Sequence, residues 1–309
     1  MAGVATMLKV VFVDLRVGNL LIALAVFLIG YFLPDLAGSL TFEAIVPLKV
    51  TVDSSLNLTF TNPRFSYPLE EEQVGRGLLV ILSAVIPTLL ITASTLISFF
   101  CLPWTHRPQK NDGDEENPTE KNDGDEENPT ETPTETRPVC TTSPAFYIGT
   151  LFMDAFSGLL ETAAFTLLVT GYLKLSCGRP RPNYAEYYLK SPHDAVSSFP
   201  SGHTSISFCG LTYASAVLWH DIAAPLVKLP RMHILIFPLL LLFMSPLLLA
   251  MWIAVTRVQD YYHNYDDITA GAFIGMASSL MVFAMHNSVP KERYLAPKVG
   301  SEAKEMDSV

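Results

Sequence analysis

Cysteine and charged residues are both scarce in this chain of 309 residues. Its four cysteines show no C-x-x-C spacing, which argues against a disulfide scaffold and against a cysteine metal site. Only 16% of the residues are charged, and the net charge of −10 is mostly local. The stretch from Arg107 to Arg137 has eleven acidic and four basic residues, so it supplies −7 of that total. Overall acidity therefore says little about the binding partner, and no feature points to nucleic acid.

Long apolar runs are what the sequence has in abundance. Half of the residues are hydrophobic and the mean hydropathy is +0.32, which is unusual for a soluble domain. A helix needs about 20 apolar residues to cross a bilayer, and backbone polar groups in lipid must be satisfied internally. We therefore predict an all-α, polytopic membrane protein with six transmembrane helices. The expected segments are 17–34, 76–102, 146–173, 203–219, 233–256 and 267–286.

The distribution of lysine and arginine predicts the orientation of these spans. Six spans place both termini on one side, and the loops on that side carry 12 of these cations, against 8 on the other side. Three of the 8 belong to the motifs described below, so the positive-inside rule predicts cytoplasmic termini and motif loops that face the lumen or the outside. Asn57, in an acceptable N-x-T sequon, is a candidate glycosylation site on the motif side. The first run could be a cleaved signal peptide, but its late start and its length favour an uncleaved span.

Three short polar blocks lie next to the apolar runs. They read Lys174-Leu-Ser-Cys-Gly-Arg-Pro-Arg181-Pro182, Pro200-Ser201-Gly202-His203 and Thr256-Arg257-Val-Gln-Asp-Tyr-Tyr-His263-Asn-Tyr-Asp-Asp267. Each block alone is a weak signal, because a cation at a membrane edge usually anchors the topology. Together they predict three cations, two histidines and an aspartate near one membrane surface.

The cations of these blocks are suited to phosphate. Phosphoryl transfer spreads negative charge over three oxygens, so it depends on preorganised cations and N–H donors. Lys174, Arg181 and Arg257 supply the cations, since arginine can grip two oxygens and lysine acts as a point charge. Ser201 and Gly202 lead into a helix whose free N–H groups and positive dipole end favour an anion. We expect these five residues to bind phosphate.

The two histidines then divide the remaining chemistry. Asp267 follows His263 by four residues, one turn if the segment is helical, and can hold a ring N–H and stabilise the imidazolium. His263 is therefore the expected nucleophile, which forms a phosphohistidine, and His203 is the expected general acid for the leaving alkoxide. Asp266 is a weaker candidate, because only Asp267 has the four-residue offset. The scheme calls for no metal and no cofactor.

These residues resemble the type 2 phosphatidic acid phosphatase superfamily, also called lipid phosphate phosphatases. The family pattern is K-x6-R-P, P-S-G-H and S-R-x5-H-x3-D, and this chain departs from it at Thr256, where a hydroxyl is retained. The stretch 62–68 also looks like the segment before the family's second span. The resemblance implies metal-independent hydrolysis of phosphatidate, lysophosphatidate, diacylglycerol pyrophosphate or sphingoid phosphates through a phosphohistidine. It implies the same roles for His263 and His203.

The chain is expected to divide into four regions. Residues 1–102 hold the first two spans and the first non-cytoplasmic loop, and residues 146–286 form the catalytic core with the other four spans. Between them, 103–145 form an acidic linker in which Lys110–Glu120 is repeated at Lys121–Glu131. It has almost no apolar surface to bury, which predicts disorder. Residues 287–309 form a cytoplasmic tail.

Two other functions stay open from the sequence. A lipid phospho-headgroup transferase would often lack the first block, and a non-enzymatic lipid-phosphate binder would usually lack a histidine or a cation. A related haloperoxidase would be soluble, and a plain transporter would not require this spacing. The preferred lipid, the oligomeric state, and the choice between endoplasmic reticulum, plasma membrane and other endomembranes are open too. Asp154 and Glu161, on one face of the third span, are candidates for a function or for pairing inside the bundle.

Overall fold

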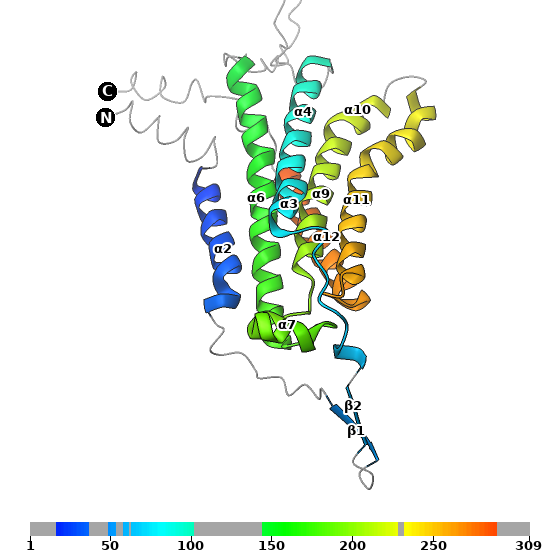
Figure 1. Cartoon of the computed structure of the whole chain (residues 1–309). Coiled ribbons are helices and arrows are strands. Elements are labelled where there is room, and N and C mark those ends of the chain that lie inside the picture. The colour runs from blue at the N-terminus through cyan, green and yellow to red at the C-terminus, as the bar shows by residue number, and fades with distance from the viewer. Residues whose placement is uncertain are drawn as a thin grey trace, which may run out of the picture.

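The computed structural model describes residues 17–36, 49–53, 58–61, 63–101, 144–227 and 232–288. The sequon at Asn57, the repeated linker and all but the first two residues of the expected tail lie outside these ranges. The described part is a bundle of helices (Figure 1). The longer helices are α2 (Val17–Leu36), α4 (Ile86–Cys101), α6 (Pro144–Cys177), α9 (Gly202–Leu218), α11 (Ile236–Gln259) and α12 (Tyr265–Ser288). The shorter ones are η2 (Pro63–Phe65), α3 (Arg76–Val80), η3 (Ile81–Val85), α7 (Tyr184–Lys190), α8 (Pro192–Ala195), η4 (Trp219–Ala223), α10 (Ala224–Val227) and η5 (Met232–Leu235).

The first loop contains a feature that we did not predict. Two short strands, β1 (Lys49–Asp53) and β2 (Leu58–Thr61), pair as an antiparallel hairpin. Both sequences alternate apolar residues with threonine or charged residues, which is the period of a strand. The longer helices overlap the predicted spans, whereas the short helices α7 and α8 lie in a segment that was predicted as a loop.

Four described helical segments are long and apolar enough to cross a membrane. They are Arg76–Phe100, Ile148–Cys177, Ile236–Gln259 and Tyr265–Ser288, and each overlaps a predicted span. The helix of the sixth predicted span, 267–286, is longer than predicted, since it begins at Tyr265 and ends at Ser288. In α2 the comparable apolar stretch is shorter, Val17–Phe32, and α9 has 17 residues. The count of six spans therefore stays a prediction.

Helix α9 is short and polar because it forms the centre of the bundle. It packs against α4, α6, α11 and α12, and most of its side chains are buried. A helix that faces other helices rather than lipid can carry small hydroxyl residues, and α9 buries Thr204, Ser205, Ser207, Thr212 and Ser215. The helical path continues through η4 and α10 to Val227.

Two glycines bring the start of α12 against the start of α9. A Cβ atom at Gly271 would lie 2.7 Å from the carbonyl oxygen of Ser201, and one at Gly275 would lie 2.3 Å from that of Ser205. Side chains at these positions would force the backbones apart. Small residues four apart are the usual means by which membrane helices approach this closely. The contact fixes the two helix N-termini side by side.

Candidate active site

The three predicted blocks meet at one end of the bundle, where α6 and α11 end and α9 and α12 begin (Figure 1). Backbone and side-chain contacts join them directly. Ser201 N donates to the carbonyl of Asp267 over 3.0 Å, and Lys174 Nζ donates to the carbonyl of Ser197. Arg181 Nη1 donates to the carbonyl of Tyr262 over 3.4 Å. The structure thus brings the predicted phosphate-binding and catalytic residues to one place, and their chemical roles stay predictions.

His263 and Asp267 form a buried pair. His263 Nδ1 lies 3.8 Å from Asp267 Oδ2, and the two side chains are 3% and 0% exposed. The pairing does not come from a helical turn, because α12 begins at Tyr265 and His263 lies in the preceding loop. The carboxylate is instead fixed by donors around it. These are Ser198 Oγ at 2.6 Å, Asn264 N at 2.8 Å and Arg179 Nη1 at 2.9 Å.

Burial controls the charge of His263. Removal of the ring from water lowers the pKa of His263 to about 3, although Asp267 opposes this shift through its negative charge. The imidazole is therefore neutral near pH 7. A neutral imidazole keeps the lone pair that a nucleophile needs.

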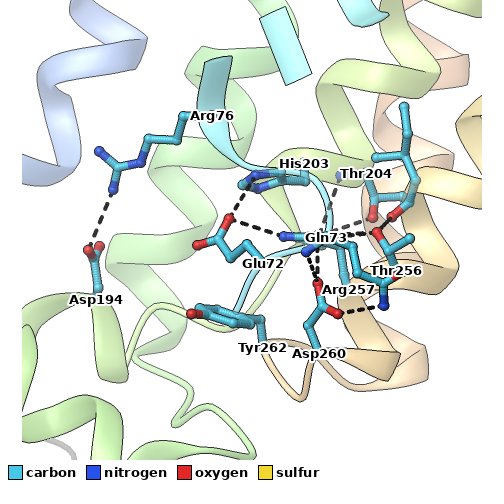
Figure 2. A network of polar contacts seen from close by, with 12 residues as sticks. Glu72, Gln73, Arg76, Asp194, His203, Thr204, Thr256, Arg257, Asp260 and Tyr262 are labelled. Carbon is cyan, nitrogen blue, oxygen red and sulfur yellow. Dashed lines mark hydrogen bonds and ion pairs between the residues drawn. The ribbon is translucent and has the colours of Figure 1, made fainter. Parts of the chain in front are cut away.

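Arg257 is a buried guanidinium held on several sides. Its side chain is 1% exposed, and Nη2 donates to Asp260 Oδ2 over 2.8 Å. Nε and Nη2 both donate to the hydroxyl of Thr256 over 3.2 Å. Thr256, which stands where the family usually has serine, therefore still provides a hydroxyl that contacts Arg257. Nη1 donates to Glu72 Oε2 over 3.2 Å (Figure 2).

Arg181 is oriented by carbonyl and aromatic groups rather than by a carboxylate contact. Nε donates to the carbonyl of Asp194 over 2.7 Å. The guanidinium carbon lies 5.3 Å from the ring centre of Tyr187 and 5.5 Å from that of Tyr262, within the range of cation–π attraction. Tyr187 and Tyr262 thus contact the motif residue Arg181 directly.

The N-terminus of α9 has the geometry expected of an anion site. Ser201 is its N-cap, and the side-chain oxygen accepts from Thr204 N over 3.4 Å and from Thr204 Oγ1 over 3.0 Å. In these contacts the Ser201 oxygen is the acceptor. Gly202 and His203 form the first helical turn, beside the Lys174 side chain.

Several residues of the site escaped the sequence analysis. Arg179 and Ser198 lie between or inside the predicted blocks and bind the Asp267 carboxylate. Arg179 also pairs with Asp266, which is 63% exposed and therefore does not compete for His263. Glu72 and Asp260 bind Arg257, and Glu72 also approaches His203 (Figure 2). The contact of Asp260 with Arg257 could have been predicted, since Asp260 lies three residues after Arg257 at the end of a helix. The contact of Glu72 could not, because Glu72 comes from the distant first loop.

The third-span acids lie in a second cluster away from this site. His286 Nε2 lies 2.9 Å from Glu161 Oε2, and His286 Nδ1 lies 3.4 Å from Asp154 Oδ1. Asp154 is 20 residues from Lys174 along α6, which corresponds to about 30 Å of helix. Asp154 and His286 also line a cavity together with Tyr213, His220 and Asp221. Both acids therefore pair inside the bundle, far from the three blocks.

No group of three or more histidine, cysteine or acidic residues in the described ranges is arranged to hold a metal ion. The groups that converge on the site are cations, N–H donors and two imidazoles, with the carboxylates of Glu72, Asp260 and Asp267 paired to them. Such a set can bind a phosphate, provide a nitrogen nucleophile and provide a proton donor.

Comparison with known proteins identifies the class. Residues 155–291 match the PAP2 superfamily. The matched region includes all three blocks. This match and the four long apolar helices support a multi-pass membrane protein.

Curated relatives agree with this class. A PA-phosphatase related-family protein of Dictyostelium discoideum is 34% identical over 152 residues, which cover 48% of this chain and 54% of that protein. Lipid phosphate phosphatase 1 of Arabidopsis thaliana is 37% identical over 141 residues, 38% of this chain and 40% of that protein. A protein of Schizosaccharomyces pombe named probable diacylglycerol pyrophosphate phosphatase 1 is 31% identical over 155 residues, 43% of this chain and 53% of that protein. The chain thus spans about half the length of these relatives or less, and no solved structure matches it significantly.

Proposed function

We propose that this protein is an integral-membrane lipid phosphate phosphatase that hydrolyses phosphomonoesters such as phosphatidate through a phosphohistidine. The observation that carries the proposal is the meeting of Lys174, Arg181 and Arg257 with His203 and the His263–Asp267 pair at one end of an apolar bundle. The names of its relatives point to lipid phosphates and diacylglycerol pyrophosphate as the substrate class. Lysophosphatidate and sphingoid phosphates belong to the same chemical class.

The first half of the proposed reaction forms the phosphoenzyme. The Nδ1 atom of His263 faces Asp267, so the opposite ring nitrogen, Nε2, is the one that attacks phosphorus. As the P–N bond forms, the bond between phosphorus and the ester oxygen breaks. His203 gives its proton to that oxygen, which leaves as the lipid alcohol. Asp267, whose Oδ2 lies 3.8 Å from Nδ1, stabilises the positive charge of the phosphorylated ring.

The second half releases phosphate. A water molecule attacks phosphorus while the now neutral His203 takes one of its protons. The P–N bond breaks, inorganic phosphate leaves, and His263 returns to its neutral form. The same histidine thus serves first as acid and then as base, as microscopic reversibility requires.

The cations stabilise the charge that builds on the three phosphoryl oxygens. Arg257 and Arg181 are buried, so their attraction for a phosphate is screened little by water. Lys174 adds a point charge, and the Ser201 hydroxyl and the N–H groups at Gly202 and His203 complete the cradle.

The proposed topology follows the same reasoning. Helices α2 and α9 would complete six spans, with the site at the lumenal or extracellular surface and the termini and linker in the cytoplasm. The catalytic unit would be residues 146–286. The protein would reside in the endoplasmic reticulum, the plasma membrane or another endomembrane.

Phosphate release tests the proposal. Detergent-solubilised full-length protein is given phosphatidate in the presence of excess chelator, beside His263→Ala and His203→Ala. We expect chelator-resistant release by the wild type and neither release nor a ³²P-labelled phosphoenzyme in His263→Ala. His203→Ala should mainly slow formation of the phosphoenzyme, because departure of the lipid alcohol lacks its proton. No release from phosphatidate and a panel of other lipid phosphates would contradict the proposal.

A further inference from the structure

Glu72 places a carboxylate between two groups of the proposed mechanism. Its Oε2 atom lies 3.2 Å from Arg257 Nη1 and 3.6 Å from His203 Nε2 (Figure 2). The Glu72 side chain is 28% exposed and that of His203 is 19% exposed, so this carboxylate meets the ring at the partly open side of the site. The approach is too long for a hydrogen bond to His203 but is within the range of an ion pair.

The chain around Glu72, residues 67–76, is held against the motif loops. We call it the clamp segment. Anchors on both sides of Glu72 hold it in register. The Tyr67 ring stacks on Tyr261, 4.8 Å between ring centres, and Val74 is fully buried. The hydrogen bonds run from Tyr67 N to Pro182 O (3.3 Å), Leu69 N to Glu186 Oε2 (2.8 Å), Gln73 N to Asp260 Oδ2 (3.0 Å) and Gln73 Nε2 to Asp260 Oδ1 (2.7 Å).

These anchors indicate a fixed group rather than one that swings in and out. Tyr261, which Tyr67 covers, has a left-handed backbone with a φ of 57°, an uncommon conformation for a bulky residue. Such a conformation persists only where its surroundings hold it. The clamp segment therefore stabilises the turn between Arg257 and His263 and presents Glu72 at a set position.

The groups around His203 affect whether its ring is protonated, and the Glu72 carboxylate is one of them. Burial of the ring, the largest effect, and the neighbouring Arg257, His263, Arg181 and Lys174 all disfavour the protonated form of His203. Three cations disfavour a further positive charge, yet a general acid must be protonated before it can donate. A carboxylate 3.6 Å away favours the protonated ring. Glu72 and Asp260 also offset the charge of Arg257 itself.

We propose that Glu72 is a positioning residue that keeps the imidazole of His203 protonated and aimed at the leaving oxygen, and that holds Nη1 of Arg257 at the phosphate site. This inference rests on the proposed function, because it takes His203 to be the general acid. It extends the site beyond the three blocks to the first loop.

Leaving groups of different acidity test the proposal through His203. An alkyl phosphate such as phosphatidate needs a proton on its leaving oxygen, whereas 4-nitrophenyl phosphate releases a stable phenolate without one. For Glu72→Gln we expect kcat on phosphatidate to fall about 10- to 100-fold and kcat on 4-nitrophenyl phosphate to change less than about threefold. The alkaline limb of the kcat profile on phosphatidate should move to lower pH. Glu72→Asp should recover part of the loss, and Glu71→Gln, an exposed acid of the same segment, should match the wild type.

A measurement that needs no catalysis separates this proposal from the proposed function. The pKa of His203 is measured from the ¹⁵N shifts of its imidazole in solubilised full-length wild type, Glu72→Gln and Glu71→Gln. We expect a lower value in Glu72→Gln alone. Phosphate release by the wild type and its loss in His263→Ala judge the proposed function independently.

Three results would overturn the role of Glu72. The first is an unchanged pKa of His203 in Glu72→Gln. The second is an equal loss of kcat on both substrates without rescue by Glu72→Asp, which would mean that Glu72 only supports the fold. The third is a lower KM and tighter inhibition by inorganic phosphate with kcat retained, which would mean that Glu72 blocks the pocket.

Discussion

Two histidine–carboxylate clusters lie toward opposite ends of α12, and their surroundings differ. At the N-terminal end, His263 and Asp267 sit among Arg179, backbone N–H donors and the motif cations. Toward the C-terminal end, His286 pairs with Asp154 and Glu161. The described residues that line the cavity beside it include no lysine or arginine.

The difference shows that residue type alone does not define a phosphate site. An α-helix carries partial positive charge at its N-terminus and partial negative charge at its C-terminus. The N-termini of α9 and α12 therefore favour an anion where His203 and Asp267 lie. The opposite end of α12 favours a cation or a protonated His286. Helix direction and nearby cations therefore favour the first cluster as the proposed phosphate site.

Removal of the two histidines should give the largest contrast. We expect His263→Asn to lower kcat on phosphatidate by at least about 10⁴-fold, because the nucleophile is lost. His286→Asn should leave kcat within about threefold of the wild type, since it changes packing far from the reacting atoms. Steady-state phosphate release measures both. A large loss of kcat in a stable His286→Asn protein would break the distinction between the clusters.

The cations around the first cluster should give the next effect. Arg257→Lys keeps the charge but loses the planar group that bonds Thr256, Asp260 and Glu72, so kcat/KM should fall about 10²- to 10³-fold. Arg76→Lys is the matched control, because Arg76 is exposed and pairs with Asp194 over 3.8 Å. Near-wild-type kcat/KM in Arg257→Lys would show that charge alone suffices.

The second cluster should respond in stability rather than in activity. Glu161→Gln replaces a carboxylate that faces His286 Nε2 at 2.9 Å inside the bundle. We expect a loss of about 1–3 kcal/mol in the free energy of unfolding, seen as a lower melting temperature in detergent, with kcat/KM unchanged. Lower kcat/KM at unchanged stability would assign this cluster a part in function.

The smallest expected effect is a loss of protein stability in acid that arises from His263. The pKa of His263 lies near 3 in the folded state because the ring is buried, against about 6.5 in the unfolded chain. Between these values the unfolded chain binds the extra proton, so stability falls as pH drops through this window. From pH 7.5 to pH 5.5 this group should cost about 1 kcal/mol. The stability of His263→Asn should fall less than that of the wild type between pH 7.5 and pH 5.5. Melting temperatures that fall in parallel for the two proteins would contradict a lowered pKa of His263.

The motif residues could be predicted because their signal is local. Lys174, His203 and Arg257 each sit at a boundary between a polar block and an apolar run, so each falls at a helix end. The pairing of His263 with Asp267 was also predicted, although a loop rather than a helical turn brings the two side chains together.

What the sequence could not predict depends on contacts between distant segments. Glu72 is one of three consecutive acids, and only the register of the clamp segment decides that it faces Arg257 while Glu71 faces solvent. The central place of α9 was hidden for the same reason, since burial among helices lets it be polar and short. The hairpin did have a local signal, the alternation of Val50 and Val52 with polar neighbours.

The close contact of the α12 and α9 N-termini has a consequence for how the protein is made. Gln73 and its partner Asp260 are 187 residues apart in sequence, and Ser201 meets Asp267 only after α12 has entered the bundle. Synthesis runs from the N-terminus, so the clamp segment is made long before the residues that it holds. Under the proposed function, a growing chain would therefore be inactive until its last helix has packed. Phosphate release would then report that the bundle is complete.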